Sequence, residues 1–340
     1  MTTRDYRQVD KVVGDTPLIL LKALSERTGC AILGKAEFMN PGGSVKDRAA
    51  LGIILDAETR GALKPGMTIV EGTAGNTGIG LTVIGAARGY RCVIVIPDTQ
   101  SPEKMELLRS LGAEVIPVPA KPYKDPDNYI HVARRMGEEN GWFWANQFDN
   151  TANRDIHEQT TGPEILRQTG GEVTAFVAAI GSGGTLGGVS RALKAADSAI
   201  ATVCADPCGA AMWNWFNRGV TEASDGDSNA EGIGQSRVTA NVADIPVDHA
   251  FKVDDQTALT ITRHLAHEEG LFLGLSSGIN VGGAVCQALR HGPGQVIVTV
   301  LCDTGVKYQS KLNNPDWLEQ QALTDSLPLE TAVAACGNTP

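Results

Sequence analysis

The sequence lacks the basic surface and the long apolar runs that mark several large classes of protein. Its 39 aspartates and glutamates outnumber its 29 lysines and arginines, which gives a formal net charge of −10. Because phosphate backbones and anionic lipids require a basic face, this balance argues against a nucleic-acid or membrane partner. No apolar run approaches the length of a bilayer span, and the polar N-terminus has no apolar signal core, so we expect a cytoplasmic location.

The cysteines form neither a disulfide framework nor a zinc motif. Their number, seven, is odd, and most of them lie inside apolar runs, as buried reduced thiols do. Cys204 and Cys208 form a C-x3-C pair, but no second pair has zinc spacing. His264 and His267 stand at positions i and i+3 of a helical stretch, where an exposed helix face is the usual explanation. We therefore expect no metal site.

Glycine, by contrast, is abundant, with 39 residues that cluster in short loops between apolar runs. Runs such as MTIVEG, RCVIVIPD and VIVTVLCD are continuously apolar, as strands buried on both faces of a parallel sheet are. Helical stretches lie between most of these runs, and this alternation indicates right-handed βαβ units. The sequence therefore predicts an α/β fold, with a division near residue 148 between two comparable strand–helix series.

Three glycine-rich loops each follow a predicted strand and precede a predicted helix. They are EGTAGNTGIG (71–80), AIGSGGTLGG (179–188) and GLSSGIN (274–280), the last of which overlaps the predicted strand run FLGLSSG. Ligands of open parallel sheets bind outside the carboxyl ends of the strands, where such loops lie. The second loop is the clearest anion site, because its glycines let helix N–H groups approach a phosphate and Ser182 and Thr185 add hydroxyl donors.

One lysine stands at an unusual place in the stretch NPGGSVKDR (40–48). Lys46 lies between a Pro-Gly-Gly turn and the start of a predicted helix. A reactive lysine must lose its charge easily, which requires partial burial and nearby donors. A turn ahead of a helix offers that placement, whereas the alternative is an ordinary lysine on a solvated helix face.

The loop at 179–188 also permits a dinucleotide-binding interpretation. GSGGTLG loosely resembles the dinucleotide fingerprint, and Asp206 ends the next predicted strand about twenty residues on, where a ribose-binding acid would stand. An NAD-dependent oxidoreductase is therefore an alternative, although it leaves Lys46 and the other two loops without a role.

Taken together, these motifs resemble those of the cysteine synthase (O-acetylserine sulfhydrylase) and cystathionine β-synthase family of pyridoxal-phosphate enzymes. The resemblance extends from GDTPLILL (14–21) to NNPDWL (313–318). It implies the fold type of tryptophan synthase β, with two three-layer αβα domains and mostly parallel, twisted sheets.

The resemblance also implies a division of the chain. Residues 1–148 would form the smaller α/β domain, although roughly residues 1–35 are expected to pack on the second domain. Residues 149–325 would form the larger domain, which holds the cofactor phosphate, and residues 326–340 would form a tail.

Each loop receives a role from the resemblance. Lys46 would be the Schiff-base lysine, Asn76 would hydrogen-bond the cofactor's phenolic oxygen, and Ser276 would meet its pyridine nitrogen. The residues that would hold the substrate carboxylate are Thr73, Ala74, Gly75, Asn76, Thr77 and Gln147. The residues that would cradle the cofactor phosphate are Gly181, Ser182, Gly183, Gly184 and Thr185.

The reaction implied by the resemblance is a β-replacement. L-cysteine would form from O-acetyl-L-serine and sulfide through an α-aminoacrylate intermediate, with Lys46 as the general base. The neutral hydroxyl of Ser276 would leave the ring a shallow electron sink, which favours loss of a β-leaving group over transamination. A homodimer and a serine acetyltransferase partner are implied by the family alone.

Several departures from the family pattern keep alternatives open. Position 74 is alanine where the family loop commonly has serine, and the stretch 231–242 departs from the commonest form after its glycines. The stretch SPEKMELLRSLGAEV is closer to that of cystathionine β-synthases. A cystathionine β-synthase or a cysteine desulfhydrase reaction is therefore the alternative to cysteine synthesis.

Overall fold

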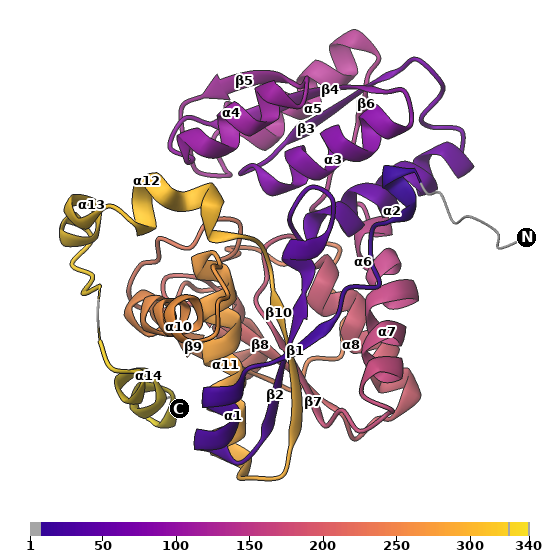
Figure 1. The fold of residues 1–340 in the computed structure, drawn as a ribbon. Coiled ribbons are helices and arrows are strands. Elements are labelled where there is room, and N and C mark those ends of the chain that lie inside the picture. Colours follow the sequence, from indigo (N-terminus) through magenta and orange to yellow (C-terminus); the bar gives the residue numbers. More distant parts are fainter. Residues whose placement is uncertain (1–7, 326, 339–340) are drawn as a thin grey trace, which may run out of the picture.

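The first strands of the chain lie beside its last strand in one sheet (Figure 1). The computed structural model describes residues 8–325 and 327–338, which fold around two sheets. The larger sheet has six strands in the order β1-β2-β10-β7-β8-β9, and only β1 runs antiparallel to its neighbour. These strands are β1 (Leu18–Leu20), β2 (Ala31–Ala36), β7 (Ala175–Ala178), β8 (Ala201–Pro207), β9 (His249–Val253) and β10 (Val296–Leu301).

The smaller sheet has four parallel strands in the order β5-β4-β3-β6 and lies in the upper part of Figure 1. Its strands are β3 (Thr68–Gly72), β4 (Arg91–Pro97), β5 (Glu114–Val118) and β6 (Phe143–Trp144). Both sheets are mostly parallel and alternate with helices, so the predicted α/β class is confirmed.

Helices connect the strands of both sheets. Those of the first half are α1 (Lys22–Thr28), α2 (Lys46–Thr59), α3 (Asn76–Ala87), α4 (Pro102–Ser110), α5 (Tyr129–Asn140), α6 (Ala152–Ile156) and α7 (Gly162–Gln168). Those of the second half are α8 (Gly184–Ala196), α9 (Met212–Arg218), α10 (Asp255–Glu268), α11 (Leu275–His291), α12 (Gln309–Leu312), α13 (Pro315–Gln320) and α14 (Leu329–Gly337). A π-helical turn at His157–Thr161 and short 3-10 turns at Val9–Lys11, Glu37–Met39 and Gly305–Tyr308 complete the elements.

The strand predicted within FLGLSSG does not form. Leu273 makes only an isolated bridge to Thr304, and α11 begins two residues later at Leu275. Phe272 and Leu273 precede the helix, and the run from Leu275 onward belongs to it. The helix is buried along most of its length, and a short apolar run does not distinguish such a helix from a buried strand.

Strands from the start of the chain join the larger sheet. β1 and β2, within residues 18–36, belong to the six-stranded sheet, whereas the four-stranded sheet is built from residues 68–144. The domain boundary at residue 148 stays a prediction.

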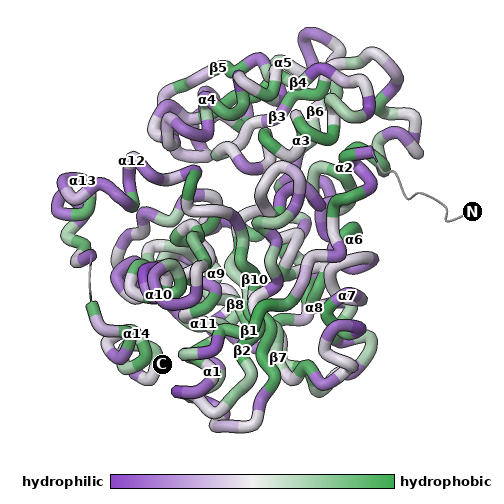
Figure 2. The backbone as a smooth tube through the Cα atoms, in the orientation of Figure 1, coloured by the Kyte–Doolittle hydropathy of each residue, from purple (hydrophilic) through white to green (hydrophobic). Residues whose placement is uncertain are grey.

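Apolar residues concentrate along the strands, as the green central segments of Figure 2 show. Along β7 and β8 alternate residues enter separate cores, with Val177 and Val203 on one face of the sheet and Phe176 and Cys204 on the other. Burial of a side chain as large as Phe176 contributes about 1.5–3 kcal/mol. The rigid sheets that result hold the loops at their carboxyl ends in place.

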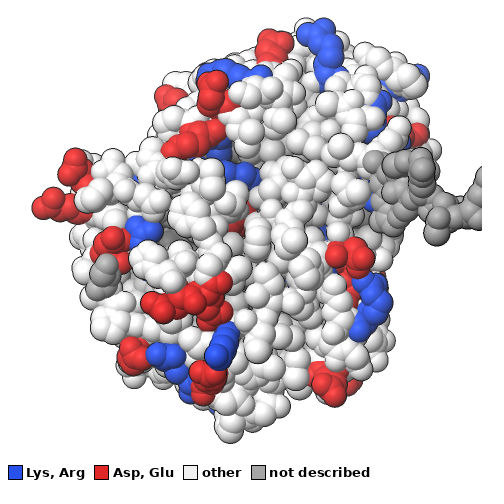
Figure 3. All heavy atoms as spheres, viewed as in Figure 1, with Lys and Arg blue, Asp and Glu red and all other residues white. Residues whose placement is uncertain are grey.

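The surface in Figure 3 intersperses acidic and basic side chains over the visible face. Among residues 8–325 and 327–338, no helix combines the length and the apolar character needed to span a membrane.

Candidate active site

A cavity of about 560 Å³ lies between loops from the two sheets. A second, narrow pocket of about 20 Å³ shares Lys46, Gly181, Ser182 and Cys302 with it. The predicted site residues that line one or both are Lys46, Thr73, Ala74, Gly75, Asn76, Thr77, Gln147, Gly181, Ser182, Gly183, Thr185 and Ser276. Gly184 lines neither pocket and instead begins α8. The fold therefore brings residues of all three glycine loops and Lys46 to the same region.

Lys46 is the first residue of α2 and is half-buried at the wall of the cavity. The preceding residue, Val45, donates its backbone N–H to the carbonyl oxygen of Cys302 at 2.9 Å, which anchors the turn to the end of β10. Burial lowers the pKa of the Lys46 ammonium, and the charge of Lys104 lowers it further, whereas Cys302 and Asp303 act in the opposite direction. A lysine with a lowered pKa suits nucleophilic and basic roles.

The loop before α8 packs so closely against neighbouring segments that its glycines have no room for a Cβ. Gly183 has a φ of +94°, and a Cβ there would lie 2.2 Å from Val242 Cγ2. A Cβ on Gly181 would lie 2.0 Å from the carbonyl oxygen of Gly232, and one on Gly184 would lie 2.1 Å from Asn153 Oδ1. The unpaired N–H groups at the start of α8 follow directly, so this loop fits a phosphate group.

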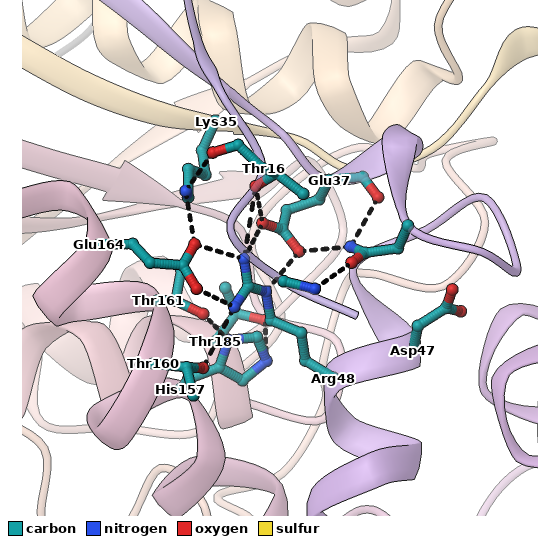
Figure 4. A network of polar contacts seen from close by, with 12 residues as sticks. Thr16, Lys35, Glu37, Asp47, Arg48, His157, Thr160, Thr161, Glu164 and Thr185 are labelled. Atoms are coloured by element: carbon teal, nitrogen blue, oxygen red, sulfur yellow. Dashed lines mark hydrogen bonds and ion pairs between the residues drawn. The ribbon is translucent and has the colours of Figure 1, made fainter. Parts of the chain in front are cut away.

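His157, which the sequence analysis did not identify, contacts the Thr185 side chain at the start of α8. Its Nε2 lies 3.2 Å from Thr185 Oγ1, and its Nδ1 lies 2.8 Å from Thr161 Oγ1 (Figure 4). Burial lowers the pKa of His157 well below its ordinary value, and the charges of Arg48 and Lys46 add to this effect. The ring is therefore neutral and holds the Thr185 hydroxyl in place.

The helix that carries Lys46 is fixed by a buried ionic cluster, drawn in Figure 4. Arg48 donates to both oxygens of Glu37 and to both oxygens of Glu164 at 2.7–2.8 Å. Lys35 Nζ lies 2.6 Å from Glu164 Oε2. Burial raises the pKa of Glu164, but the hydrogen bonds and charges of Arg48 and Lys35 outweigh it and hold the pKa at about 2. The cluster thus ties α2 to β2 and α7.

Gln147, the predicted carboxylate-binding glutamine, is buried beside the 73–77 loop. Thr77 Oγ1 donates to Gln147 Oε1 at 2.6 Å. Glu71 accepts the backbone N–H groups of Asn146 at 2.8 Å and Gln147 at 3.3 Å, while Asn146 has a φ of +51°. Burial raises the pKa of Glu71 to about 8, although these hydrogen bonds oppose the rise. A buried carboxyl group therefore holds the turn that presents Gln147.

Ser276 lies in the first turn of α11, is buried and lines the cavity. Cys302 stands next to it, and burial raises the pKa of this thiol to about 11, whereas Lys46 and a hydrogen bond with Ser276 act to lower it. The hydroxyl of Ser276 and the thiol of Cys302 are thus both neutral near pH 7.

The stretch at 231–242 forms one wall of the cavity and is tied to both sheets. Glu231 accepts from Lys104 of α4 and from Lys311 of α12, each at 2.6 Å. Arg237 donates to both oxygens of Asp149, at 3.1 and 2.9 Å. The departures from the family pattern in this stretch therefore fall on the wall that a substrate would face.

The acidic residue of the oxidoreductase alternative does not join the glycine loop at the cavity. Asp206 is fully buried, lines neither pocket, and accepts the backbone N–H of Trp213 at 2.8 Å at the start of α9.

His264, one histidine of the pair at positions i and i+3, lies 3.8 Å from Glu269 Oε1. In the part of the chain that the structure describes, no three histidine, cysteine, aspartate or glutamate side chains are grouped so as to hold a metal ion.

Comparisons with known proteins agree with this geometry. Cysteine synthase 1 of Neurospora crassa is 51% identical over 322 residues, which cover 93% of this chain and 85% of that protein. The cysteine synthase of Dictyostelium discoideum is 46% identical and covers 91% of this chain and 84% of its own length.

Solved structures give the same result. O-ureido-L-serine synthase superposes with a TM-score of 0.82 at 36% identity, covering 97% of this chain and all (100%) of that chain. The O-acetylserine dependent cystathionine β-synthase of Helicobacter pylori has a TM-score of 0.82 at 31% identity, covering 91% of this chain and 98% of that chain. Residues 9–303 match the family model described as pyridoxal-phosphate dependent enzyme, and the chain belongs to that family of enzymes.

Proposed function

We propose that the protein is a cysteine synthase, which forms L-cysteine from O-acetyl-L-serine and sulfide by β-replacement. One observation carries the proposal: Lys46, the 73–77 loop, Gln147, Ser276 and the loop before α8 surround a single cavity. Relatives at 51% and 46% identity that carry the name cysteine synthase support it.

The cavity suits pyridoxal phosphate at three places. Lys46 would hold the cofactor through its amine, the glycines at 181–184 with Ser182 and Thr185 would hold its phosphate, and Ser276 would face its ring nitrogen. When bound, the cofactor supplies an electron sink for the α-carbon of an amino-acid substrate. The half-buried environment of Lys46 favours its neutral amine.

The remaining residues would orient the substrate and move its proton. Thr73, Thr77 and Gln147 would bind the substrate carboxylate, in a loop that the bond from Thr77 to Gln147 already orders. The Lys46 amine would remove the proton from the α-carbon as general base. The acetate group would then leave, sulfide would add to the β-carbon, and the protonated Lys46 amine would return a proton to the α-carbon. The pocket would exclude water from this exchange.

A different nucleophile or leaving group is the second candidate. Ala74 offers no side-chain hydroxyl at the cavity wall, and Glu231 and Arg237 line the same cavity in the divergent stretch. A cystathionine β-synthase or cysteine desulfhydrase reaction would use the same Lys46. The solved structure of an O-acetylserine dependent cystathionine β-synthase makes the first of these the stronger alternative.

A comparison of the products formed from different substrates tests the proposal. The purified enzyme is supplied with O-acetylserine, serine, O-phosphoserine or cysteine, each with sulfide or with homocysteine, and products are quantified by mass spectrometry. Cysteine formed fastest from O-acetylserine and sulfide is the expected result. Cystathionine as the dominant product would favour the alternative, and release of sulfide from cysteine alone would favour a desulfhydrase.

We further propose that the enzyme works as a homodimer in the cytoplasm, and that a serine acetyltransferase is a partner. The family resemblance supports the dimer and the partner. Five of the seven cysteines are buried, which fits thiols in a reducing compartment. Light scattering of the purified enzyme, alone and with a serine acetyltransferase, tests both associations.

A further inference from the structure

A buried polar cluster lies behind Asn76, the first residue of α3. Asn76 Nδ2 donates to Asp303 Oδ2 at 2.7 Å, and Lys307 Nζ donates to Asn76 Oδ1 at 3.1 Å. Asp303 is 0% exposed and Lys307 is 5% exposed. Neither of them lines the cavity, whereas Asn76, which contacts both, does.

The Lys307 ammonium has a partner for each of its N–H bonds. It donates to the carbonyl oxygens of Gly42 at 3.0 Å and Gly43 at 3.1 Å, in addition to Asn76 Oδ1. Three acceptors match the three donors of an ammonium group. Since residues 42–43 form the turn ahead of Lys46, a single side chain fixes both that turn and Asn76.

Asp303 is held equally firmly on the other side of the amide. Its Oδ2 also accepts the hydroxyl of Tyr308 at 2.7 Å, and its backbone pairs with that of Ser44. A Cβ on Gly274 would lie 2.5 Å from Asp303 Oδ1, so the carboxylate is closely packed there. The short segment after β10 therefore places Asp303 beside the nitrogen and Lys307 beside the oxygen of the Asn76 amide.

Only one orientation of the Asn76 amide satisfies both neighbours. An ammonium group accepts no hydrogen bond, and an ionised carboxylate donates none, so the amide oxygen must face Lys307 and the amide nitrogen must face Asp303. A rotation of the amide by half a turn would place donor against donor and acceptor against acceptor. The amide nitrogen has a second N–H, so Asn76 is presented to the cavity as a donor.

We propose that Asp303 and Lys307 are positioning residues that fix Asn76 as a hydrogen-bond donor toward the phenolic oxygen of pyridoxal phosphate and tie it to the turn that carries Lys46. The proposal rests on the function proposed above, because it needs the cofactor to lie beside Asn76. Without the pair, Asn76 can turn its carbonyl oxygen toward the phenolic oxygen, where two acceptors repel each other.

The test uses cofactor-free protein prepared as wild type, Lys307→Met, Asp303→Asn and Lys307→Arg, with Lys64→Met as a control at an exposed lysine. Three quantities are measured for each: the pyridoxal-phosphate dissociation constant, the absorption maximum of the loaded protein across pH, and the melting temperature of the cofactor-free protein. We expect about tenfold weaker cofactor binding and a shifted absorption maximum for Lys307→Met and Asp303→Asn. Lys307→Arg, which keeps a donor cation, should restore most of the affinity, and Lys64→Met should behave as wild type.

The outcomes separate this proposal from the proposed function. If the wild type binds no pyridoxal phosphate, both proposals are overturned. If the wild type binds it while Lys307→Met and Asp303→Asn bind it equally well and absorb at the same wavelength, only the role of the pair is overturned. A lower melting temperature with an unchanged absorption maximum would also overturn it, because that pattern is what a purely structural pair would give.

Discussion

At the scale of single residues, the site consists of charged groups that the fold removes from water. Lys46 begins a helix at the cavity wall, and burial lowers the pKa of its ammonium. Lys307 and Asp303 are still more buried and have partners on several sides. Burial of unpaired charge costs several kcal/mol per ion, so these contacts are required and not incidental.

Replacement of Lys46 by alanine should abolish the reaction and leave the fold intact. Because a positioned general base contributes about a hundredfold to ten-thousandfold, the rate should fall by at least that factor. The visible absorption band should also be lost, since the other lysines that line the cavity already have carboxylate partners: Glu231 for Lys104 and Lys311, and Asp127 for Lys121. Steady-state rates and absorption spectra measure both effects, with Lys64→Ala as the control. Substantial activity in Lys46→Ala would contradict the assignment.

Ala74→Ser should improve binding of O-acetylserine. Ala74 lines the cavity, and a serine hydroxyl there would add a donor for the substrate carboxylate. One hydrogen bond of net value about 0.5–1.5 kcal/mol lowers KM by about twofold to thirteenfold. Ala74→Cys, which is of similar size but a poor donor, is the matched control. Equal KM values for wild type, Ala74→Ser and Ala74→Cys would show that this position does not touch the carboxylate.

At the scale of elements, the site is formed by the glycine-containing turns that precede four helices. α2, α3, α8 and α11 begin at Lys46, Asn76, Gly184 and Leu275, and each is preceded by a glycine or by a glycine-containing turn. The N–H groups of a first helical turn lack partners within the helix and carry partial positive charge. Four such starts around one space make a site for anionic groups such as a phosphate and a carboxylate.

Gly183→Ala should weaken both the fold and cofactor binding. Its φ of +94° strains any residue with a Cβ, and that Cβ would lie 2.2 Å from Val242 Cγ2. We expect a loss of about 1–3 kcal/mol in the free energy of unfolding, measured in urea on cofactor-free protein, together with weaker cofactor binding. Gly61→Ala provides the control, because Gly61 has a φ of +69° with no atom within 4 Å of its Cβ. Similar losses in both variants would mean that backbone strain alone is responsible.

At the scale of the whole molecule, ionic links join parts of the chain that are distant in sequence. Glu231 connects α4, beside the small sheet, with α12, and the Arg48 cluster connects α2 with β2 and α7. Within the molecule three buried carboxyl groups also have raised pKa values through burial: Asp47 and Asp206 at about 7 and Glu71 at about 8. These groups make the stability of the whole fold depend on pH.

The contribution of Glu71 to the free energy of unfolding should fall as pH rises from about 4.5 to 8. In this window the unfolded chain has released the Glu71 proton and the folded chain retains it, because the ordinary value of 4.5 is raised to about 8. One proton contributes a slope of at most about 1.4 kcal/mol per pH unit. Glu71→Gln should therefore flatten the dependence, as urea unfolding of cofactor-free protein at several pH values will show. An unchanged slope, equal to that of the exposed-residue control Glu139→Gln, would mean that Glu71 is ionised in the folded state.

The sequence predicted the parts of the site whose chemistry demands particular residue types in a fixed order. The glycine loops, Lys46 and Ser276 carry such signals. The stretch SPEK (101–104) has the residue types of a capped helix start, and α4 does begin at Pro102, but Ser101 Oγ donates to the carbonyl oxygen of Lys307 and does not cap the helix.

The rest depends on contacts between distant residues and leaves no local pattern. Arg48 lies in a helical stretch that would suit a solvated face, yet its partner Glu164 stands 116 residues away. Asp303 and Lys307 have the same difficulty with Asn76, at separations of 227 and 231 residues. Tertiary packing decides which charged side chains are buried, so their burial cannot be predicted from a single sequence.

The visible absorption spectrum of the purified protein, before and after addition of O-acetylserine without sulfide, tests the central claim most directly. The account predicts a yellow band that moves to longer wavelength with O-acetylserine and returns when sulfide is added. A yellow protein that does not respond to O-acetylserine would contradict the proposed substrate. A protein that stays colourless after incubation with pyridoxal phosphate would contradict the role of Lys46 itself.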